Sequence, residues 1–249
     1  MTDNHKTMLL VGATSDIGHA TALVYAKAGW GVFLAARNVE SAQRNADDIA
    51  TRTGAAVGVY PLDVLQSEAM PHFVDSLPAL PDTVICVVGE MGDQERAQAD
   101  LDHAAMVVRT NFEGPALLLG LFANRFLTRG SGTIVGVSSV AGDRGRGTNY
   151  VYGAAKAGFT AFLSGLRNRL APRGLRVITV KPGFVRTRMT AGMKLPPLLT
   201  AEPAEVGAAI LAAAEGKRGR DVIYVRRVWR GVMSVIGAIP EPIFKKLKL

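Results

Sequence analysis

The sequence predicts an α/β protein built on one doubly wound, parallel sheet of seven strands. Short apolar runs rich in β-branched residues alternate along the chain with longer segments of helical periodicity. Most of the short runs are apolar at consecutive positions, which is typical of parallel strands that helices cover on both faces. This alternation favours a parallel sheet over separate α and β layers. The predicted strands are residues 8–11, 32–36, 57–62, 84–88, 134–137, 177–180 and 222–225, and the predicted helices are residues 17–28, 39–53, 66–77, 101–128, 153–171 and 203–215.

The length and composition favour one large domain. A chain of 249 residues, 48% of them apolar, is long enough to enclose a packed core. No internal repeat, linker or low-complexity segment interrupts the alternation. We therefore predict a single domain over residues 1–225 and an amphipathic appendage over residues 226–249, called the C-terminal tail below.

The cysteine content and the N-terminal residues favour a cytoplasmic location. Cys86 is the one cysteine, which excludes an internal disulfide and a Cys-rich metal cage and fits a reducing compartment. No metal site is predicted. The polar N-terminal residues lead into an apolar run that is too short for a secretory signal, and no apolar run is long enough to span a bilayer.

Positive charge is concentrated at the C-terminal end. The formal net charge is +8, and residues 217–249 carry nine Lys or Arg and two acidic residues, which leaves +1 for the first 216 residues. A nearly neutral body argues against nucleic acid as a partner. The basic end instead predicts an anionic partner there.

The first predicted strand runs into a turn that contains two glycines. Glycines in such a turn let backbone N–H groups approach a pyrophosphate at the N-terminus of the following helix. An ordinary strand-to-helix turn is the alternative, and the place of this turn after the first strand favours the dinucleotide site. The predicted pyrophosphate-binding residues are Gly12, Thr14, Ser15, Asp16, Ile17 and Gly18.

The ends of the second and third predicted strands supply candidate contacts to the adenosine half of a dinucleotide. Arg37 stands where an acidic residue would accept ribose hydroxyls, and an Arg there suits a 2′-phosphate. We therefore favour NADP(H) as the cofactor. The competing interpretation is that Arg37 is a solvated residue at a strand end, which leaves NAD(H) as the alternative. Asp63 and the adjacent Val64 follow the third strand; Asp63 either reaches the adenine edge or caps the next helix.

The stretch from Ser138 to Lys156 contains the candidate proton-transfer residues. Tyr152 and Lys156 are four residues apart and therefore share one face of a helix. A free Tyr has a pKa near ~10, and a close ammonium group favours the phenolate and lowers that pKa. We predict that Tyr152 exchanges the proton, that Lys156 tunes it, and that Ser139 holds the substrate oxygen. A surface pair on a helix is the alternative for Tyr152 and Lys156.

Two further segments carry polar residues in unusual places. Asn111 lies inside a largely apolar helical pattern, where Asn either has a polar task or marks a local distortion. Pro182 and Gly183 end the sixth predicted strand sharply, and Thr187 suits a hydrogen bond to a bound ring amide.

With these residues laid out, the chain resembles the short-chain dehydrogenase/reductase family over about residues 8–225. The resemblance implies a Rossmann fold, hydride transfer from a nicotinamide to a carbonyl carbon, and a homodimer or homotetramer. It also implies that Lys156 holds the nicotinamide ribose and that Asn111 holds a water for proton relay. The motifs that carry it are Gly12-x5-Gly18, Asp63, Asn111-x2-Gly114, Ser139, Tyr152-x3-Lys156 and Pro182-Gly183-x3-Thr187, and it adds Gly89 and Val185 to the expected cofactor contacts.

Two positions depart from the family pattern. The middle glycine of the glycine turn is replaced by Asp16, whose carboxylate is unfavourable near a pyrophosphate unless it points away or caps the helix. The fourth strand ends in Cys86-Val-Val-Gly89 instead of Asn-Asn-Ala-Gly. The tie between strands that the family makes through Asn must therefore be replaced by another group.

The C-terminal tail departs from an ordinary member of the family. Its apolar residues recur at helical spacing beside Arg226, Arg227 and Arg230. A basic amphipathic helix with a Trp suits an anionic membrane surface, and the alternative is packing against a subunit or the core. The predicted apolar face consists of Val225, Val228, Trp229, Val232, Met233, Ile236 and Ile239.

Several stretches, among them residues 138–144, 149–153 and 185–189 and the C-terminal tail, look like decaprenylphosphoryl-2-keto-ribose reductases. That narrower resemblance implies a polyprenyl-phosphate keto sugar as the substrate, a flavin oxidase partner and a peripheral place on the inner face of the membrane. A soluble reductase of 3-oxoacyl thioesters or other ketones is the alternative, and a non-catalytic dinucleotide-binding scaffold is a third. The cations expected near a substrate phosphate are Arg144, Arg146, Arg186, Arg188 and Lys194.

Overall fold

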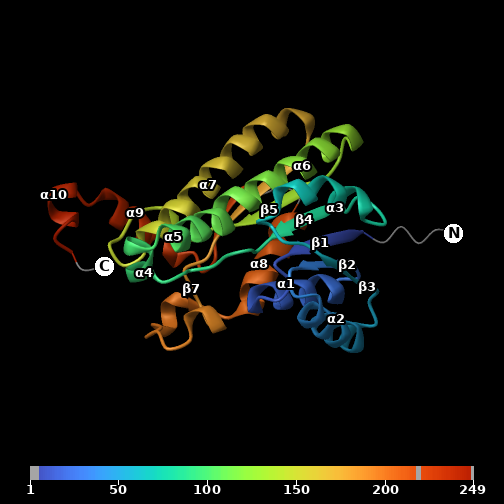
Figure 1. The fold of residues 1–249 in the computed structure, drawn as a ribbon, viewed down its shortest axis with the longest axis horizontal. Helices are drawn as coiled ribbons and strands as arrows, with labels where there is room; N and C mark the ends of the chain where they lie inside the picture. The colour runs from blue at the N-terminus through green and yellow to red at the C-terminus, as the bar shows by residue number, and fades with distance from the viewer. Residues whose placement is uncertain (1–5, 217–219, 248–249) are drawn as a thin grey trace.

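One parallel sheet with helices on both faces forms the body of the protein (Figure 1). The structure is a computed structural model and describes residues 6–216 and 220–247; Lys217, Arg218 and Lys248 of the basic C-terminal region lie outside the described residues. All seven predicted strands are confirmed, in the order β3-β2-β1-β4-β5-β6-β9. They are β1 (Thr7–Val11), β2 (Gly31–Ala36), β3 (Val57–Pro61), β4 (Thr83–Cys86), β5 (Thr133–Val137), β6 (Arg176–Lys181) and β9 (Val222–Tyr224), and a separate ribbon pairs β7 (Phe184–Val185) with β8 (Thr200–Ala201).

The helices divide into two layers, one on each face of the sheet (Figure 1). On β1, Met8 and Leu10 belong to the core under one layer, whereas Leu9 and Val11 belong to the core under the other. Burial on both faces explains why the strands are continuously apolar. The first layer consists of α1 (Asp16–Lys27), α2 (Val39–Thr53) and α8 (Pro203–Glu215), and the second contains α3 (Met70–Ser76), α6 (Gly114–Arg129) and α7 (Tyr150–Leu170).

The long helix predicted over residues 101–128 is interrupted. It consists of α5 (Leu101–Val108), a π-helical turn (Arg109–Glu113) and α6. Asn111 lies in the π-helical turn, so the local distortion predicted from an Asn at this position is confirmed. A short helix that the sequence pattern did not predict, α4 (Gln94–Ala99), precedes α5 and begins at the capping side chain of Asp93.

The C-terminal tail contains α9 (Val228–Ala238) and α10 (Glu241–Phe244), which extend from one end of the body (Figure 1). Trp229 and Met233 are each only 4% exposed and pack with Val140 of the body. This part of the predicted apolar face therefore packs against the protein's own core, as the packing alternative expects. No helix within residues 6–216 and 220–247 is long and apolar enough to cross a membrane.

Candidate active site

Two cavities meet at the carboxyl end of the sheet, where β2 and β4 flank β1. The first, called the nucleotide cleft, has a volume of about 170 Å³, and the second, called the substrate pocket, has about 150 Å³; Val87 and Gly89 line both. The strand order reverses at β1, with β2 on one side and β4 on the other. Ligands of open α/β sheets bind at the carboxyl end of the strands at such a reversal. Predicted residues that line the nucleotide cleft are Gly12, Thr14, Ser15, Arg37, Asp63, Val64 and Gly89, and those that line the substrate pocket are Ile17, Gly89, Ser139, Tyr152, Lys156, Pro182, Gly183, Val185 and Thr187.

The turn between β1 and α1 has the shape that a pyrophosphate site requires. Gly12 has a φ of +91°, and a Cβ there would lie 3.1 Å from the Val88 backbone nitrogen. A Cβ on Gly18 would lie 2.6 Å from the Gly12 carbonyl oxygen. The Ser15 hydroxyl caps α1 by accepting a hydrogen bond from the Gly18 N–H at 3.0 Å. A side chain at either glycine would meet the protein's own backbone, so the turn can be this tight only with glycine at both positions. Such a turn at a helix N-terminus fits a dinucleotide pyrophosphate.

Asp16, which replaces the family's middle glycine, points toward the segment after β7. Its two carboxylate oxygens accept hydrogen bonds from the Arg188 backbone N–H at 2.7 Å and from Arg188 Nε at 2.9 Å. The Asp16 carboxylate is thus paired with the Arg188 guanidinium, which reduces the repulsion that an unpaired carboxylate would exert on a bound pyrophosphate. Asp16 and Gly18 line neither the nucleotide cleft nor the substrate pocket; they shape the turn.

The adenosine end of the nucleotide cleft carries Arg37 and Asp63. Arg37 is exposed and follows β2 directly. The Asp63 carboxylate accepts a hydrogen bond from the Leu65 N–H at 2.9 Å and forms a local turn. The alternative in which Asp63 caps the following helix is therefore wrong, because that helix begins at Ser67 without a side-chain cap.

Lys156 supplies the tie between strands that the missing Asn residues would make. Its ammonium group donates hydrogen bonds to the Val88 carbonyl at 3.1 Å, beyond β4, and to the Val137 carbonyl at 3.2 Å, at the end of β5. The side chain is 3% exposed, and burial lowers its pKa to about 8. A buried cation thus holds the two strands at the edge of the substrate pocket.

Tyr152 does not have the lowered pKa that the sequence predicts. Burial raises its pKa to about 12, and the hydrogen bond from Ser139 offsets only part of that rise. The Lys156 ammonium lies 5.8 Å from the centre of the Tyr152 ring and donates to backbone carbonyls instead. Desolvation of the phenolate therefore outweighs the attraction of the ammonium. Tyr152 stays protonated at neutral pH, which suits a proton donor.

The two serines at the end of β5 have different surroundings. The Ser138 hydroxyl donates to the Lys156 carbonyl oxygen at 3.0 Å and lies 2.7 Å from the Thr160 hydroxyl, so it fixes α7 to the sheet. The Ser139 hydroxyl accepts a hydrogen bond from the Ala141 N–H and also bonds Tyr152. The structure therefore brings Ser139, not Ser138, to Tyr152.

Asn111 is fully buried behind the pocket and lines neither cavity. Both hydrogens of its amide are used, one on the Val107 carbonyl at 2.8 Å and one on the Glu90 carbonyl at 2.6 Å. Its Oδ1 accepts the Glu90 N–H at 3.2 Å. These bonds make Asn111 a positioning residue that fixes the chain after Gly89; the water relay remains a prediction.

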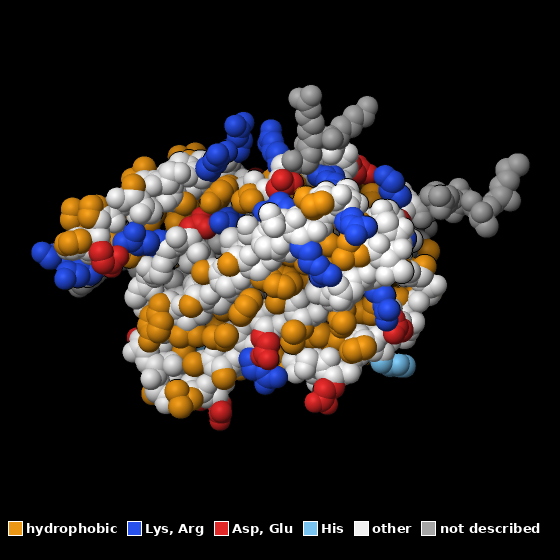
Figure 2. Space-filling view, turned by 90° about the horizontal axis from the view of Figure 1, so that it is seen from above, with side chains coloured by type: hydrophobic (Ala, Val, Ile, Leu, Met, Phe, Trp, Pro, Cys, Tyr) orange, Lys and Arg blue, Asp and Glu red, His pale blue; other side chains and the backbone are white. Residues whose placement is uncertain are grey.

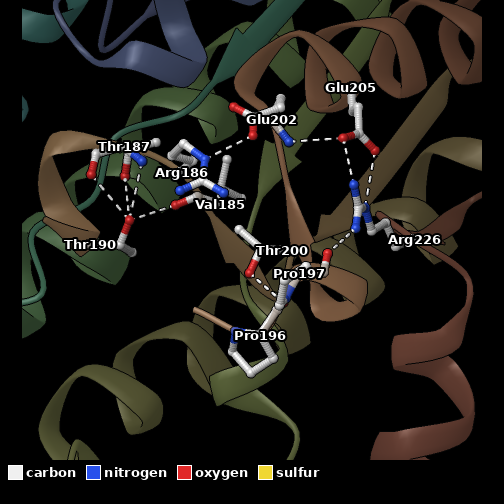
Figure 3. Close-up of polar contacts among 10 residues, drawn as sticks. All are labelled: Val185, Arg186, Thr187, Thr190, Pro196, Pro197, Thr200, Glu202, Glu205 and Arg226. Atoms are coloured by element: carbon white, nitrogen blue, oxygen red, sulfur yellow. Dashed lines mark hydrogen bonds and ion pairs between the residues drawn. The ribbon is translucent and has the colours of Figure 1, made fainter. Parts of the chain in front are cut away.

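The segment after β7 is held by its own hydrogen bonds (Figure 3). The Thr190 hydroxyl donates to the Val185 carbonyl at 2.6 Å and accepts the Thr187 N–H at 3.1 Å. Between β9 and α9, the Arg226 guanidinium donates to the Glu205 carboxylate. The Arg226 backbone has a left-handed conformation there, with a φ of 58°. Thr187 therefore faces the substrate pocket from a fixed turn.

Trp229 of the C-terminal tail is a pocket residue that the sequence did not identify. It lines the substrate pocket, and its indole N–H donates to the Leu199 carbonyl at 2.9 Å. A Cβ on Gly183 would overlap the indole ring, so the Pro182-Gly183 turn needs its glycine for this contact. Met91, Met189 and Met193 add apolar lining. No local pattern links these residues, because they come together only in the fold.

Comparison with known proteins identifies the family. A family model described as short chain dehydrogenase matches residues 6–196. An uncharacterised oxidoreductase of Mycobacterium tuberculosis is 34% identical over 245 residues, 96% of each chain, and another of Streptomyces coelicolor is 35% identical over 246 residues, 97% of this chain and 96% of the relative. A solved short-chain dehydrogenase from Sphingobium yanoikuyae in complex with NADPH has a TM-score of 0.79 at 24% identity and covers 95% of this chain and 97% of that one.

The chain therefore belongs to the short-chain dehydrogenase/reductase family. It is an NAD(P)-dependent oxidoreductase that acts on CH–OH groups. The two uncharacterised relatives carry names that specify no substrate. The narrower resemblance to decaprenylphosphoryl-2-keto-ribose reductases consequently rests on the sequence motifs alone.

Proposed function

We propose that this protein is an NADPH-dependent ketoreductase in which Tyr152 donates the proton. The observation that carries the proposal is the meeting of Ser139, Tyr152 and Lys156 in one pocket that shares Val87 and Gly89 with the nucleotide cleft. When bound, the cofactor supplies a hydride to the carbonyl carbon of the substrate. The protein's own residues supply the proton and hold the carbonyl oxygen.

Each of the three polar residues has a distinct task in this proposal. The Tyr152 phenol, protonated because burial raises its pKa to about 12, transfers its proton to the oxygen that gains negative charge. Ser139 orients that oxygen by a hydrogen bond and stabilises its charge. Lys156, held between the Val88 and Val137 carbonyls, places a positive charge beside the pocket and binds the nicotinamide ribose.

The preference for NADPH over NADH rests on Arg37. The guanidinium lies at the end of β2 in the nucleotide cleft, at the place where an acidic residue would select NADH. Asn38, the next residue, uses its side chain to cap α2 by accepting the Ser41 N–H at 2.8 Å. Arg37 has no ion-pair partner among the residues the structure describes and therefore supports a 2′-phosphate contact.

We infer that the substrate is a lipid-linked keto sugar, with a soluble ketone or 3-oxoacyl thioester as the alternative, because the exposed face of the C-terminal tail favours a lipid-linked substrate. Val235 is 68% exposed and Ile243 is 55% exposed, and Lys245 and Lys246 follow directly. Hydrophobic and basic side chains lie together at that end of the molecule (Figure 2). Such a face suits an anionic membrane surface. A soluble ketone or 3-oxoacyl thioester needs no such face.

The remaining expectations belong to the same proposal. A catalytic domain over residues 1–225 would be completed by the C-terminal tail, which contributes Trp229 to the lining of the substrate pocket. We expect a homodimer or homotetramer from the family resemblance and a cytoplasmic location from the cysteine content and the N-terminal residues. The narrower resemblance adds a peripheral place on the membrane and a flavin oxidase partner. We disfavour a non-catalytic scaffold because Ser139, Tyr152 and Lys156 line one pocket.

Cofactor oxidation tests the proposal directly. We expect the protein to oxidise NADPH faster than NADH in the presence of a ketone, and Arg37→Gln to reduce that preference by on the order of tenfold. The substrate panel should contain polyprenyl-phosphate keto sugars, 3-oxoacyl thioesters and small ketones. Arg44→Gln, which removes an exposed Arg that pairs with Glu40 on α2, is the matched control. Failure to oxidise either cofactor with any ketone would contradict the proposal.

A further inference from the structure

The cations around the substrate pocket differ in what they bind. Arg144 pairs with Glu241 at 2.6 Å, Arg186 pairs with Glu202 at 2.9 Å, and Arg188 pairs with Asp16. Lys194 is exposed and does not line the substrate pocket. Of the cations expected near a substrate phosphate, Arg146 is therefore the one that lines the pocket.

Arg146 is half-buried, and one of its guanidinium donors is buried without a partner. Its Nε is inaccessible to solvent and makes no hydrogen bond within the described residues. Burial lowers its pKa, while the nearby charge of Asp143 opposes that effect. A buried donor without a partner costs free energy, so its presence beside a cavity indicates that something in the cavity supplies the acceptor.

The nearest acid is already committed to other groups. One oxygen of Asp143 binds Lys181 Nζ at 2.5 Å, and the other accepts the Tyr224 hydroxyl at 2.8 Å. These bonds fix the loop that begins at Asp143 to β6 and β9. The loop therefore presents Arg146 to the pocket without neutralising it through an ion pair.

Asn149, three residues further on, lies in the same situation. It occupies the N-cap position of α7, yet its side chain makes no capping hydrogen bond. Its Oδ1 is buried without a partner, and the residue lines the substrate pocket. The rest of the lining is largely apolar, with Met91, Phe184 and Trp229 among it. An anionic group and a hydroxyl group on the ligand would satisfy both polar residues.

We propose that Arg146 forms an anion-binding subsite of the substrate pocket, with Asn149 Oδ1 beside it to accept a hydroxyl group of the ligand, so that the ketone this enzyme takes carries a phosphate or carboxylate on an apolar body. The inference rests on the proposed reductase function for the identity of the ligand as a ketone. The subsite itself is a property of the pocket and can be measured without turnover. Because a guanidinium binds both anions, the shared chemistry is a compact oxyanion.

Isothermal titration of the NADPH-saturated protein with octyl phosphate, octanoate and octanol tests the subsite. The wild type should bind at least one of the anions on the order of tenfold more tightly than octanol. Arg146→Gln should remove that preference, Arg146→Lys should keep part of it, and Lys194→Gln should leave it unchanged. Lys194→Gln removes the same charge from an exposed position next to the pocket, so it separates direct contact from a general effect of charge.

The results also separate the subsite from the reaction. Equal binding of octanol and both anions by the wild type, or an anion preference that survives in Arg146→Gln, would overturn the subsite. The subsite is supported if Arg146→Gln loses the preference for anions. If the wild type then also fails to reduce 5-oxohexanoate and its methyl ester, the subsite stands and the ketoreductase proposal is in doubt. Tighter binding of octyl phosphate than of octanoate would assign the subsite to a phosphate.

Discussion

Replacing Tyr152 by Phe is expected to lower kcat for ketone reduction by at least ~100-fold, the lower end of what a positioned general acid contributes. The change removes one buried hydroxyl, whose pKa burial raises to about 12, and leaves the ring in place. Ser139 would lose a hydrogen-bond partner but would still accept the Ala141 N–H. Steady-state oxidation of NADPH with the best ketone of the panel measures the effect.

Two controls make the Tyr152 result specific. Tyr150→Phe changes a tyrosine in the same helix that is 45% exposed and should leave kcat within twofold of wild type, roughly the scatter expected for a surface substitution. NADPH binding to Tyr152→Phe, followed by fluorescence, should remain intact. A Tyr152→Phe protein that binds NADPH and keeps wild-type kcat would show that another group donates the proton.

Replacing Gly183 by Ala is expected to raise KM for the ketone strongly and to lower the free energy of unfolding by about 1–3 kcal/mol, the usual cost of overpacking. A Cβ at this position would overlap the Trp229 indole. The indole would have to leave its place between Phe184 and the Leu199 carbonyl. Because Trp229 lines the substrate pocket, the pocket wall would move with it. Initial-rate kinetics and thermal unfolding measure the two effects.

The matched control for Gly183→Ala is Gly231→Ala on α9. A Cβ on Gly231 would meet no atom within 4 Å, so this change should be neutral or should stabilise by up to ~1 kcal/mol through helix propensity. Unchanged KM and unfolding temperature in Gly183→Ala would contradict the packing of the C-terminal tail described here.

The strands and the cofactor turn were predictable because their causes are local. Continuous apolar runs follow from burial on both faces of the sheet, and the turn after β1 needs glycine where a Cβ would meet the backbone. A local distortion at Asn111 was also foreseeable, since Asn is unfavourable within a helix, although its π-helical form was not. Each of these features depends only on which residues occur in a short segment and on the spacing of its apolar residues.

Other features depend on contacts between distant segments and could not be predicted. The pairing of Asp16 with Arg188 and the contact of Gly183 with Trp229 join positions that have no fixed spacing. The predicted lowering of the Tyr152 pKa was wrong for the same reason. The sequence places an ammonium four residues away, but only the structure shows that the Lys156 ammonium donates to two backbone carbonyls.

The dependence of kcat/KM on pH is the most direct test of Tyr152 as a neutral proton donor beside a charged Lys156, because kcat/KM reports groups of the free enzyme. Burial lowers the pKa of Lys156 to about 8 and raises that of Tyr152 to about 12. Below the first value Lys156 is an ammonium and Tyr152 is a phenol, so the rate of reduction should be level. It should fall as the pH rises through about 8, where Lys156 loses its proton. A rate of reduction that instead rises with pH through this range would show that the phenolate is the active form and would contradict the account.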